Sequence, residues 1–287
     1  MILNETYTLS DGIEIPKLGL GTWFIDDDKA AQAVRDAVKI GYRHFDSAEA
    51  YGNEHGVGEG VRTCGLPREE IFITTKLAAE MKTYEDAAKA IDESLAKMDI
   101  GYIDLMLIHS PQPWDNYRLD KRSYDKGNLE AWRALEDAVK AGKLRSIGVA
   151  NFEQPDIDSL LAGCTIRPVV NQLLAHISNT PHELIAYSES KGMKVQAYSP
   201  IAHGQILKTP EIVSMAERYG VTVPQLCIRY TLQLGLISLP KTGNPEHMKS
   251  NAEVDFVISD EDMEILKTME KIRDYGEFSY FPVFSGK

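Results

Sequence analysis

The chain has 287 residues, of which 43% are hydrophobic, and its formal net charge is -12. This length and composition are ample for a large α/β core, and we expect a single domain over residues 1–287. The acidic balance argues against nucleic acid and anionic membranes as partners. The polar N-terminus lacks a signal-peptide core, and no apolar run is long enough to span a membrane. We therefore expect a cytoplasmic protein.

The three cysteines, Cys64, Cys164 and Cys227, are odd in number and far apart in the sequence. This pattern favours free thiols in a reducing compartment. The cysteines share no metal-like spacing, and the chain contains no HExxH, GxSxG or P-loop motif. We therefore expect no metal site.

The predicted elements begin with a β-hairpin over residues 6–16, in which Asp11 and Gly12 supply the turn. After it, short apolar segments alternate with longer amphipathic ones. We predict eight strands, at residues 17–23, 42–47, 71–76, 104–109, 146–151, 169–173, 194–200 and 236–241. We predict helices at residues 27–41, 52–65, 83–101, 128–143, 155–164, 182–192 and 223–235, from near Pro245, and at 259–271.

The predicted strands are short and apolar without alternation, which is typical of strands buried on both faces of a parallel sheet. Eight βα units in this length predict an α/β fold of the (β/α)8 TIM-barrel type, preceded by the N-terminal β-hairpin. The loop over residues 111–128 is long for a βα connection, so we expect it to shape the active site. The aromatic-rich tail, residues 274–287, is expected to fold over the barrel mouth.

Ionisable side chains stand at or near the ends of three successive predicted strands. Asp46 lies near the end of the second strand, Lys76 ends the third and His109 ends the fourth, while Tyr51 follows Asp46 by one short loop. The carboxyl ends of all strands in a parallel barrel meet at the face where active sites lie. We therefore expect these four side chains to form one site that performs proton chemistry.

Tyrosine is a useful general acid only if its phenolate is stabilised, because its ordinary pKa is about 10. A neighbouring ammonium lowers that pKa, and we predict that Lys76, kept charged by Asp46, does so for Tyr51. His109 is predicted to bind and orient a carbonyl oxygen. No side chain stores a hydride, so a nicotinamide or flavin cofactor must supply one. Considered one at a time, each residue also has a purely structural explanation: Asp46 could cap a strand, Lys76 could be a surface lysine and His109 could be a buried histidine. Their joint occurrence at successive strand ends favours catalysis.

The whole chain resembles the aldo-keto reductases. The segments GLGTW, DSAEAYGNE, ITTKL, LIHSPQP, GVANF, NQL, AYSPI and LPKTGNPEH occur in the family's order and spacing. The chain is similar to bacterial members of the diketogluconate reductase type. The resemblance implies a (β/α)8 barrel that reduces carbonyls with NADPH, with Asp46, Tyr51, Lys76 and His109 as catalytic tetrad and Tyr51 as the acid.

The resemblance also implies a cofactor site. Asn151 and Gln172 match the pair that holds the nicotinamide carboxamide, and Tyr198 matches the ring that stacks on the nicotinamide, although it also fits an ordinary core aromatic. Ala150 replaces the usual serine, which removes one hydrogen bond. The other implied contacts are Gly21, Thr22 and Asp46 near the ribose, Ser199, Pro200 and Ile201 along the pyrophosphate, Lys241, Thr242, Gly243, Asn244 and His247 at the 2′-phosphate, and Asn251 at the adenine.

His247 stands where the family usually has arginine. Arginine is always charged and can donate two parallel hydrogen bonds to a phosphate, whereas a neutral histidine has no charge and only one N–H donor. We expect the preference for NADPH to survive through Lys241, and NADH to be accepted more readily than by typical members.

The substrate pocket departs from the family pattern. Trp23 and Tyr51 are expected to flank the substrate carbonyl beside His109, but Ser110 and Ala78 stand where tryptophan is common. The loss of two large rings predicts a wider or reshaped pocket that is more polar near the histidine.

Trp114, in the long loop, either compensates for the missing rings or only packs within the loop. Tyr280 and Phe281 are expected to close the pocket from the tail. Members of this length reduce small aldehydes, α-dicarbonyls or keto-sugar acids, and no basic residue is clearly aimed at a substrate carboxylate.

The leading hypothesis is an NADPH-dependent aldehyde and ketone reductase. A cofactor-binding regulatory barrel is the alternative from another class, since such folds also host non-enzymes, although binding alone would not need Tyr51 or Lys76. A third hypothesis is an alcohol or hydroxysteroid dehydrogenase, because the same groups serve the oxidative direction. The outer helices show no apolar stripe beyond what the barrel buries, so we expect a monomer.

Overall fold

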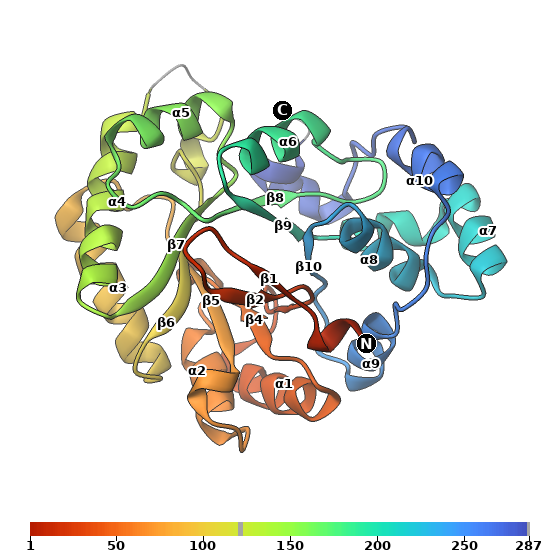
Figure 1. Ribbon diagram of the computed structural model, residues 1–287, viewed down its shortest axis with the longest axis horizontal. Helices are drawn as coiled ribbons and strands as arrows, with labels where there is room; N and C mark the ends of the chain where they lie inside the picture. The colour runs from red at the N-terminus through yellow and green to blue at the C-terminus, as the bar shows by residue number, and fades with distance from the viewer. Residues whose placement is uncertain (120–122, 286–287) are drawn as a thin grey trace.

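The computed structural model describes residues 1–119 and 123–285. Eight parallel strands, β3 to β10, form one sheet in which spatial order follows the sequence. Parallel bridges from Leu18 to Ser238 and from Gly21 to Lys241 join the two edges of this sheet. The sheet is therefore a nearly closed barrel with helices around it (Figure 1), which confirms the predicted TIM-barrel fold.

Each predicted strand overlaps an observed one, and four of the observed strands, β3, β4, β9 and β10, are shorter than predicted. The strands are β3 Leu20–Gly21, β4 His44–Asp46, β5 Phe72–Leu77, β6 Ile103–Ile108, β7 Leu144–Ala150, β8 Val170–Leu174, β9 Lys194–Tyr198 and β10 Ile237–Leu239. The helices are α1 Asp27–Ile40, α2 Glu54–Thr63, α3 Tyr84–Met98, α4 Asp125–Lys140, α5 Gln154–Gly163, α6 His182–Ser190, α7 Pro210–Tyr219, α8 Val223–Gln233, α9 Pro245–Ala252 and α10 Asp260–Lys267. In the part of the chain that the structure describes, no helix has the length and hydropathy to cross a membrane.

The N-terminal hairpin closes one end of the barrel. Strands β1 (Thr6–Thr8) and β2 (Glu14–Pro16) pair antiparallel, and Gly12 at the turn has a φ of +87°, which suits glycine. Ile15 is fully buried in a cluster with Val170 and Ile237, which begin β8 and β10. The hairpin therefore covers the amino ends of the strands, and in Figure 1 it crosses the centre of the barrel.

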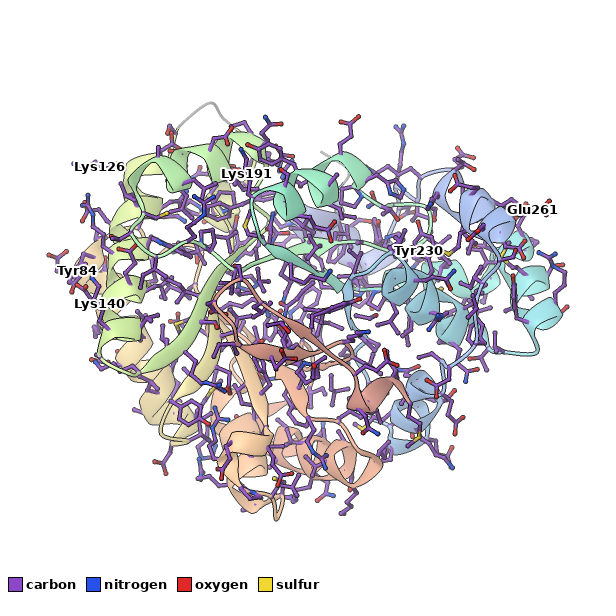
Figure 2. The ribbon with its side chains drawn as sticks, viewed as in Figure 1. Tyr84, Lys126, Lys140, Lys191, Tyr230 and Glu261 are labelled. Atoms are coloured by element: carbon purple, nitrogen blue, oxygen red, sulfur yellow. The ribbon has the colours of Figure 1, made fainter. Side chains whose placement is uncertain are left out.

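Glycines bring the first two helices close together. A Cβ atom at Gly56 or Gly60 of α2 would collide with α1, and one at Gly58 would lie 2.1 Å from the carbonyl oxygen of Met98, at the end of α3. These glycines let α2 lie directly against both neighbours. Charged side chains lie on the outside of the helix ring, as Figure 2 shows for Lys140 of α4 and Glu261 of α10, which point away from the barrel.

Two elements after β9 were not predicted. The 3-10 segment Ala202–Lys208 and helix α7 lie between β9 and α8, where the sequence analysis placed no element. In the 3-10 segment, His203 and Gly204 have left-handed backbone angles that break the helix, so no regular period marks it.

The long loop after β6 is shorter than predicted, because α4 begins at Asp125 rather than at residue 128. Residues 120–122 of this loop and residues 286–287 of the predicted tail lie outside the described part of the chain. The rest of the tail forms two short 3-10 turns, Gly276–Tyr280 and Pro282–Phe284.

Candidate active site

A cavity of about 1230 Å³ opens at the carboxyl ends of the strands, opposite the hairpin. Residues at or just beyond the ends of six strands line it, namely Gly21, Asp46, His109, Asn151, Tyr198 and Leu239, together with Gln172 from within β8. The barrel therefore gathers the ionisable side chains predicted at the strand ends around one cavity.

The Lys76 ammonium organises the centre of this site. Its Nζ donates hydrogen bonds to Asp46 Oδ1 at 2.6 Å, to the Ser47 carbonyl at 2.7 Å and to the Tyr51 hydroxyl at 3.1 Å. Lys76 is completely buried, and these three bonds use all three of its hydrogens. Because the Tyr51 oxygen accepts from Lys76, the hydroxyl proton of Tyr51 stays free to donate elsewhere.

Electrostatics keep Lys76 charged. Burial has the largest single effect and lowers the pKa of Lys76, but the Asp46 carboxylate and Tyr51 together raise the pKa by more, so that the net shift is upward. The ammonium therefore persists at neutral pH inside the barrel.

The expectation of a lowered pKa for Tyr51 is wrong. Burial raises the pKa of Tyr51, the Lys76 ammonium lowers it, and Asp46 raises it again, so that the net direction is upward. Lys76 acts in the predicted sense, but the cost of placing a phenolate in this apolar surrounding is larger. Tyr51 is thus protonated at neutral pH.

His109 is a neutral ring on the wall of the cavity. It is 9% exposed, and its ring meets those of Tyr51 and Trp114 at centroid distances of 5.8 and 5.2 Å. Burial lowers the pKa of His109 well below its usual value, and Lys76 adds to this effect. Within the described residues its buried Nδ1 has no hydrogen-bond partner. A proton on Nε2 is therefore favoured, because it leaves Nδ1 as an unpaired acceptor, and buried N–H groups without a partner are rarer in proteins than buried acceptors without one.

Two amide side chains connect the tetrad to the rest of the cavity. Gln172 Nε2 donates to Asp46 Oδ2 at 2.7 Å and to Gln196 Oε1 at 2.8 Å. Asn151 Nδ2 donates to the His109 carbonyl at 3.0 Å, and Asn151 Oδ1 accepts from the Tyr198 hydroxyl at 2.7 Å. Gln196, which the sequence analysis did not identify, therefore holds Gln172 in place.

Most residues predicted to bind a cofactor line the cavity. Those that line it are Gly21, Thr22, Asp46, Asn151, Gln172, Tyr198, Ser199, Pro200, Ile201, Lys241, Thr242, His247 and Asn251. Gly243 and Asn244 do not line it; Asn244 instead caps α9, where its Oδ1 accepts from the Glu246 amide at 2.9 Å. Lys241 and His247 are exposed, next to the start of this helix.

Of the residues predicted only for the substrate, Trp23 and Trp114 line the cavity and Ser110 does not. Ser110 is fully buried, and its Oγ accepts from the Gln112 amide at 3.3 Å. The Trp114 ring packs edge-on against His109 at 85°. Trp114 thus covers part of the space beside the histidine that the substitutions at Ser110 and Ala78 leave open.

Tyr280 and Phe281 line the cavity, as expected of the tail, but several other aromatic residues there were missed. These are Phe24, Tyr117, His203, Phe278 and Phe284. The His203 ring stacks on Phe278 at a centroid distance of 4.1 Å and meets Phe284 edge-on at a centroid distance of 4.5 Å. These contacts link the segment after β9 to the tail. The composition of the tail signalled its aromatic residues, whereas nothing in the sequence signalled His203.

Comparison with known proteins decides the family. The model of the Aldo/keto reductase family matches residues 17–271. The chain belongs to this family. The (β/α)8 fold, the order of the motifs and the cavity at the carboxyl ends of the strands all agree with this membership.

Relatives and solved structures cover nearly the whole chain of this aldo-keto reductase. It is 37% identical to the glyoxal reductase of Bacillus subtilis, over 94% of each chain, and 35% identical to the glycerol 2-dehydrogenase (NADP(+)) of Saccharomyces cerevisiae, over 92% and 90%. The Bombyx mori aldo-keto reductase in complex with NADP superposes with a TM-score of 0.84, at 32% identity and 98% coverage of each chain. An aldo/keto reductase from Brucella melitensis gives the same TM-score at 36% identity, covering 92% of this chain and 98% of its own.

In residues 1–119 and 123–285, no three histidine, cysteine, aspartate or glutamate side chains are grouped so as to hold a metal ion. All three cysteines are free thiols.

Proposed function

We propose that this enzyme reduces aldehydes and ketones to alcohols with NADPH as hydride donor and Tyr51 as general acid. The observation that carries the proposal is the bond from Lys76 to Tyr51, because it fixes the phenol and leaves the phenolic proton free. Both named relatives, a reductase and an NADP(+)-dependent dehydrogenase, support this reaction class.

The cavity has the groups that a nicotinamide dinucleotide needs. Both hydrogens of the Gln172 amide are already bonded, so its oxygen is the atom left to accept from a carboxamide. Tyr198 offers an aromatic face, and Lys241 with His247 offers cationic or neutral donors beside the start of α9. Bound there, the cofactor supplies the hydride that no side chain can.

The protein's own groups handle the proton. Tyr51 and neutral His109 donate hydrogen bonds to the substrate oxygen, which orients the carbonyl and polarises it. As negative charge develops on that oxygen, Tyr51 releases its proton to it. The buried Lys76 ammonium, held by Asp46, stabilises the resulting phenolate. The upward shift in the pKa of Tyr51 keeps its hydroxyl protonated until the proton is transferred to the substrate oxygen.

Replacement of Tyr51 tests the proposal. We expect Tyr51→Phe to lower kcat for NADPH oxidation at least a hundredfold with any substrate of a panel of aldehydes, α-dicarbonyls and keto-sugars. Quenching of protein fluorescence by NADPH should be retained, because the cofactor contacts remain. Tyr84→Phe is the matched control, since its hydroxyl bonds only to Asp137 on the outer surface (Figure 2).

Two outcomes would reject the proposal. Equal turnover in Tyr51→Phe and wild type would remove Tyr51 as the acid. Binding of NADPH without turnover by the wild-type enzyme on the whole panel would favour the regulatory barrel instead.

Cofactor selectivity follows from His247. Lys241 supplies a charge for a 2′-phosphate, but His247 lacks the fork of an arginine, so we propose a moderate preference for NADPH with measurable use of NADH. We expect His247→Arg to raise the ratio of kcat/KM for NADPH to that for NADH about tenfold, as one charge-assisted bond would. A wild-type preference of many thousandfold would contradict this.

The reaction direction, the compartment and the oligomeric state of the enzyme are further parts of the proposed function. The same groups can take a proton from an alcohol, so the cellular ratio of reduced to oxidised cofactor decides whether the enzyme acts as a reductase or as a dehydrogenase. We propose a cytoplasmic monomer; the three free thiols support the compartment, and the monomer rests on the expectation that the outer helices carry no apolar stripe beyond what the barrel buries. Size-exclusion chromatography with light scattering checks the latter.

A further inference from the structure

The mouth of the cavity carries an unusual share of the exposed apolar surface. In the described residues, seven large apolar side chains are at least 40% exposed: Met1, Phe24, Leu119, Leu207, Val257, Ile265 and Tyr280. Four of them, Phe24, Leu119, Leu207 and Tyr280, line the cavity. Scattered exposed apolar residues need no explanation, but a group of them around one opening marks a binding surface.

Phe24 is held at this mouth against its backbone preference. Its φ is +59°, a left-handed conformation that is rare for a bulky residue. Its side chain is 55% exposed, although the centroid of its ring lies only 4.5 Å from that of Trp23, 5.7 Å from that of Phe278 and 6.0 Å from that of Phe281. Strained residues of this kind concentrate at functional sites, and here the conformation places an aromatic ring at the rim.

An apolar path joins the reacting groups to the rim. The centroid of the Trp23 ring lies 6.2 Å from that of Tyr51 and 5.0 Å from that of Phe281. The ring centroids of Phe281 and Tyr280 are 5.8 Å apart. Tyr280 is 88% exposed. The aromatic surface is therefore continuous from Tyr51 through Trp23 to the solvent.

Within residues 1–119 and 123–285, this path offers no cationic side chain to an anionic substrate. Lys241, at the end proposed for the 2′-phosphate, is the one lysine or arginine among the described residues that line the cavity. Arg118, in the loop after β6, does not line the cavity and pairs with Glu153. The ionisable group at the loop wall is an acid, Asp115, which disfavours carboxylates further.

From these observations, and resting on the proposed function, we infer the substrate class: uncharged carbonyl compounds with an extended apolar chain or ring, whose tail lies over Trp23, Phe24 and Tyr280. Small α-dicarbonyls and keto-sugar acids are then poor substrates, because they leave the apolar path unfilled or bring an unpaired charge.

A series of straight-chain aldehydes from propanal to decanal tests the inference. Each methylene that reaches the path leaves water, so kcat/KM should rise about two- to fourfold per methylene until the chain passes the rim. Glyoxal, methylglyoxal and a keto-sugar acid should fall below butanal in kcat/KM. Phe24→Ala and Tyr280→Ala should each lower the ratio of kcat/KM for octanal to that for propanal, by about tenfold and threefold.

Val257→Ala is the matched control, because Val257 is 67% exposed and does not line the cavity; the ratio should not change. If Phe24→Ala fails to fold, Tyr280→Ala still measures the contribution of the rim, because Tyr280 is 88% exposed and its replacement should not disturb folding.

The outcomes separate the two proposals. A flat or falling series with active short aldehydes would overturn the substrate class and leave the reductase intact, as would an unchanged octanal ratio in both rim variants. Turnover of none of the compounds would reject the proposed function itself.

Discussion

Asp46 and Lys76 form an ion pair inside the barrel, with exposed side-chain fractions of 5% and 0%. Removing one member of a buried pair leaves the other charge without compensation, which costs about 3–5 kcal/mol. We therefore expect Asp46→Asn to destabilise the protein by about that amount in urea unfolding, and Asp46→Asn with Lys76→Met to recover part of the loss.

The exposed pair of Lys140 and Asp137 provides the comparison. Asp137→Asn should leave the unfolding midpoint unchanged, because exposed pairs contribute little. A single Asp46→Asn variant as stable as wild type would show that Lys76 is neutral in the folded protein.

The sequence predicted the tetrad because the strand ends of a parallel barrel must meet. It did not predict that Ser110 turns into the protein interior or that Asn244 caps a helix, because chain position does not determine which way a loop side chain turns. It also missed the net pKa direction of Tyr51, since the burial of this side chain depends on residues that other strands bring beside it, such as Trp23 and His109.

At the scale of elements, the packing of α2 depends on a glycine. A Cβ at Gly58 would lie 2.1 Å from the Met98 carbonyl oxygen and 2.5 Å from its Cα, and backbone atoms cannot move aside cheaply. We expect Gly58→Ala to cost about 1–3 kcal/mol, the usual range for overpacking, measured by urea unfolding.

Gly243→Ala serves as its control, because nothing lies within 4 Å of a Cβ there and its φ is ordinary. Its stability should equal or slightly exceed that of wild type. If Gly58→Ala were equally stable, α2 and α3 would have to separate without cost.

The alternation of apolar and amphipathic segments predicted the order of the elements because each strand of this barrel is followed by its own helix. The connection from β9 to α8 breaks this rule with the extra helix α7. Its buried residues Ile212, Met215 and Ala216 do follow a helical period, so the pattern was present, but the one-strand, one-helix expectation left no place for it.

At the scale of the whole molecule, buried histidines predict acid sensitivity. Burial lowers the pKa of His44 to about 3 and that of His176 to about 4, whereas both titrate near 6.5 in the unfolded chain. As the pH falls below 6.5, the unfolded chain takes up protons first, so stability declines until the folded values are reached.

At pH 5 each of these two histidines should cost about 2 kcal/mol relative to pH 8, measured as the free energy of unfolding in urea at both pH values. His176→Gln should flatten part of this decline, whereas replacement of the exposed His182 with Gln should not. A stability that is constant from pH 8 to pH 5 would contradict the prediction.

The two chain ends differ in their relation to the cavity. The amino terminus lies beside Asp255, with the Ile2 amide bonded to its carboxylate at 3.1 Å, and the chain then leads into the hairpin that closes the barrel. The tail instead lines the open mouth as far as Ser285. An affinity tag or surface linker attached at the carboxyl end would therefore emerge where substrate must enter, while one attached at the amino end would leave the mouth clear, so purification and immobilisation should use the amino end.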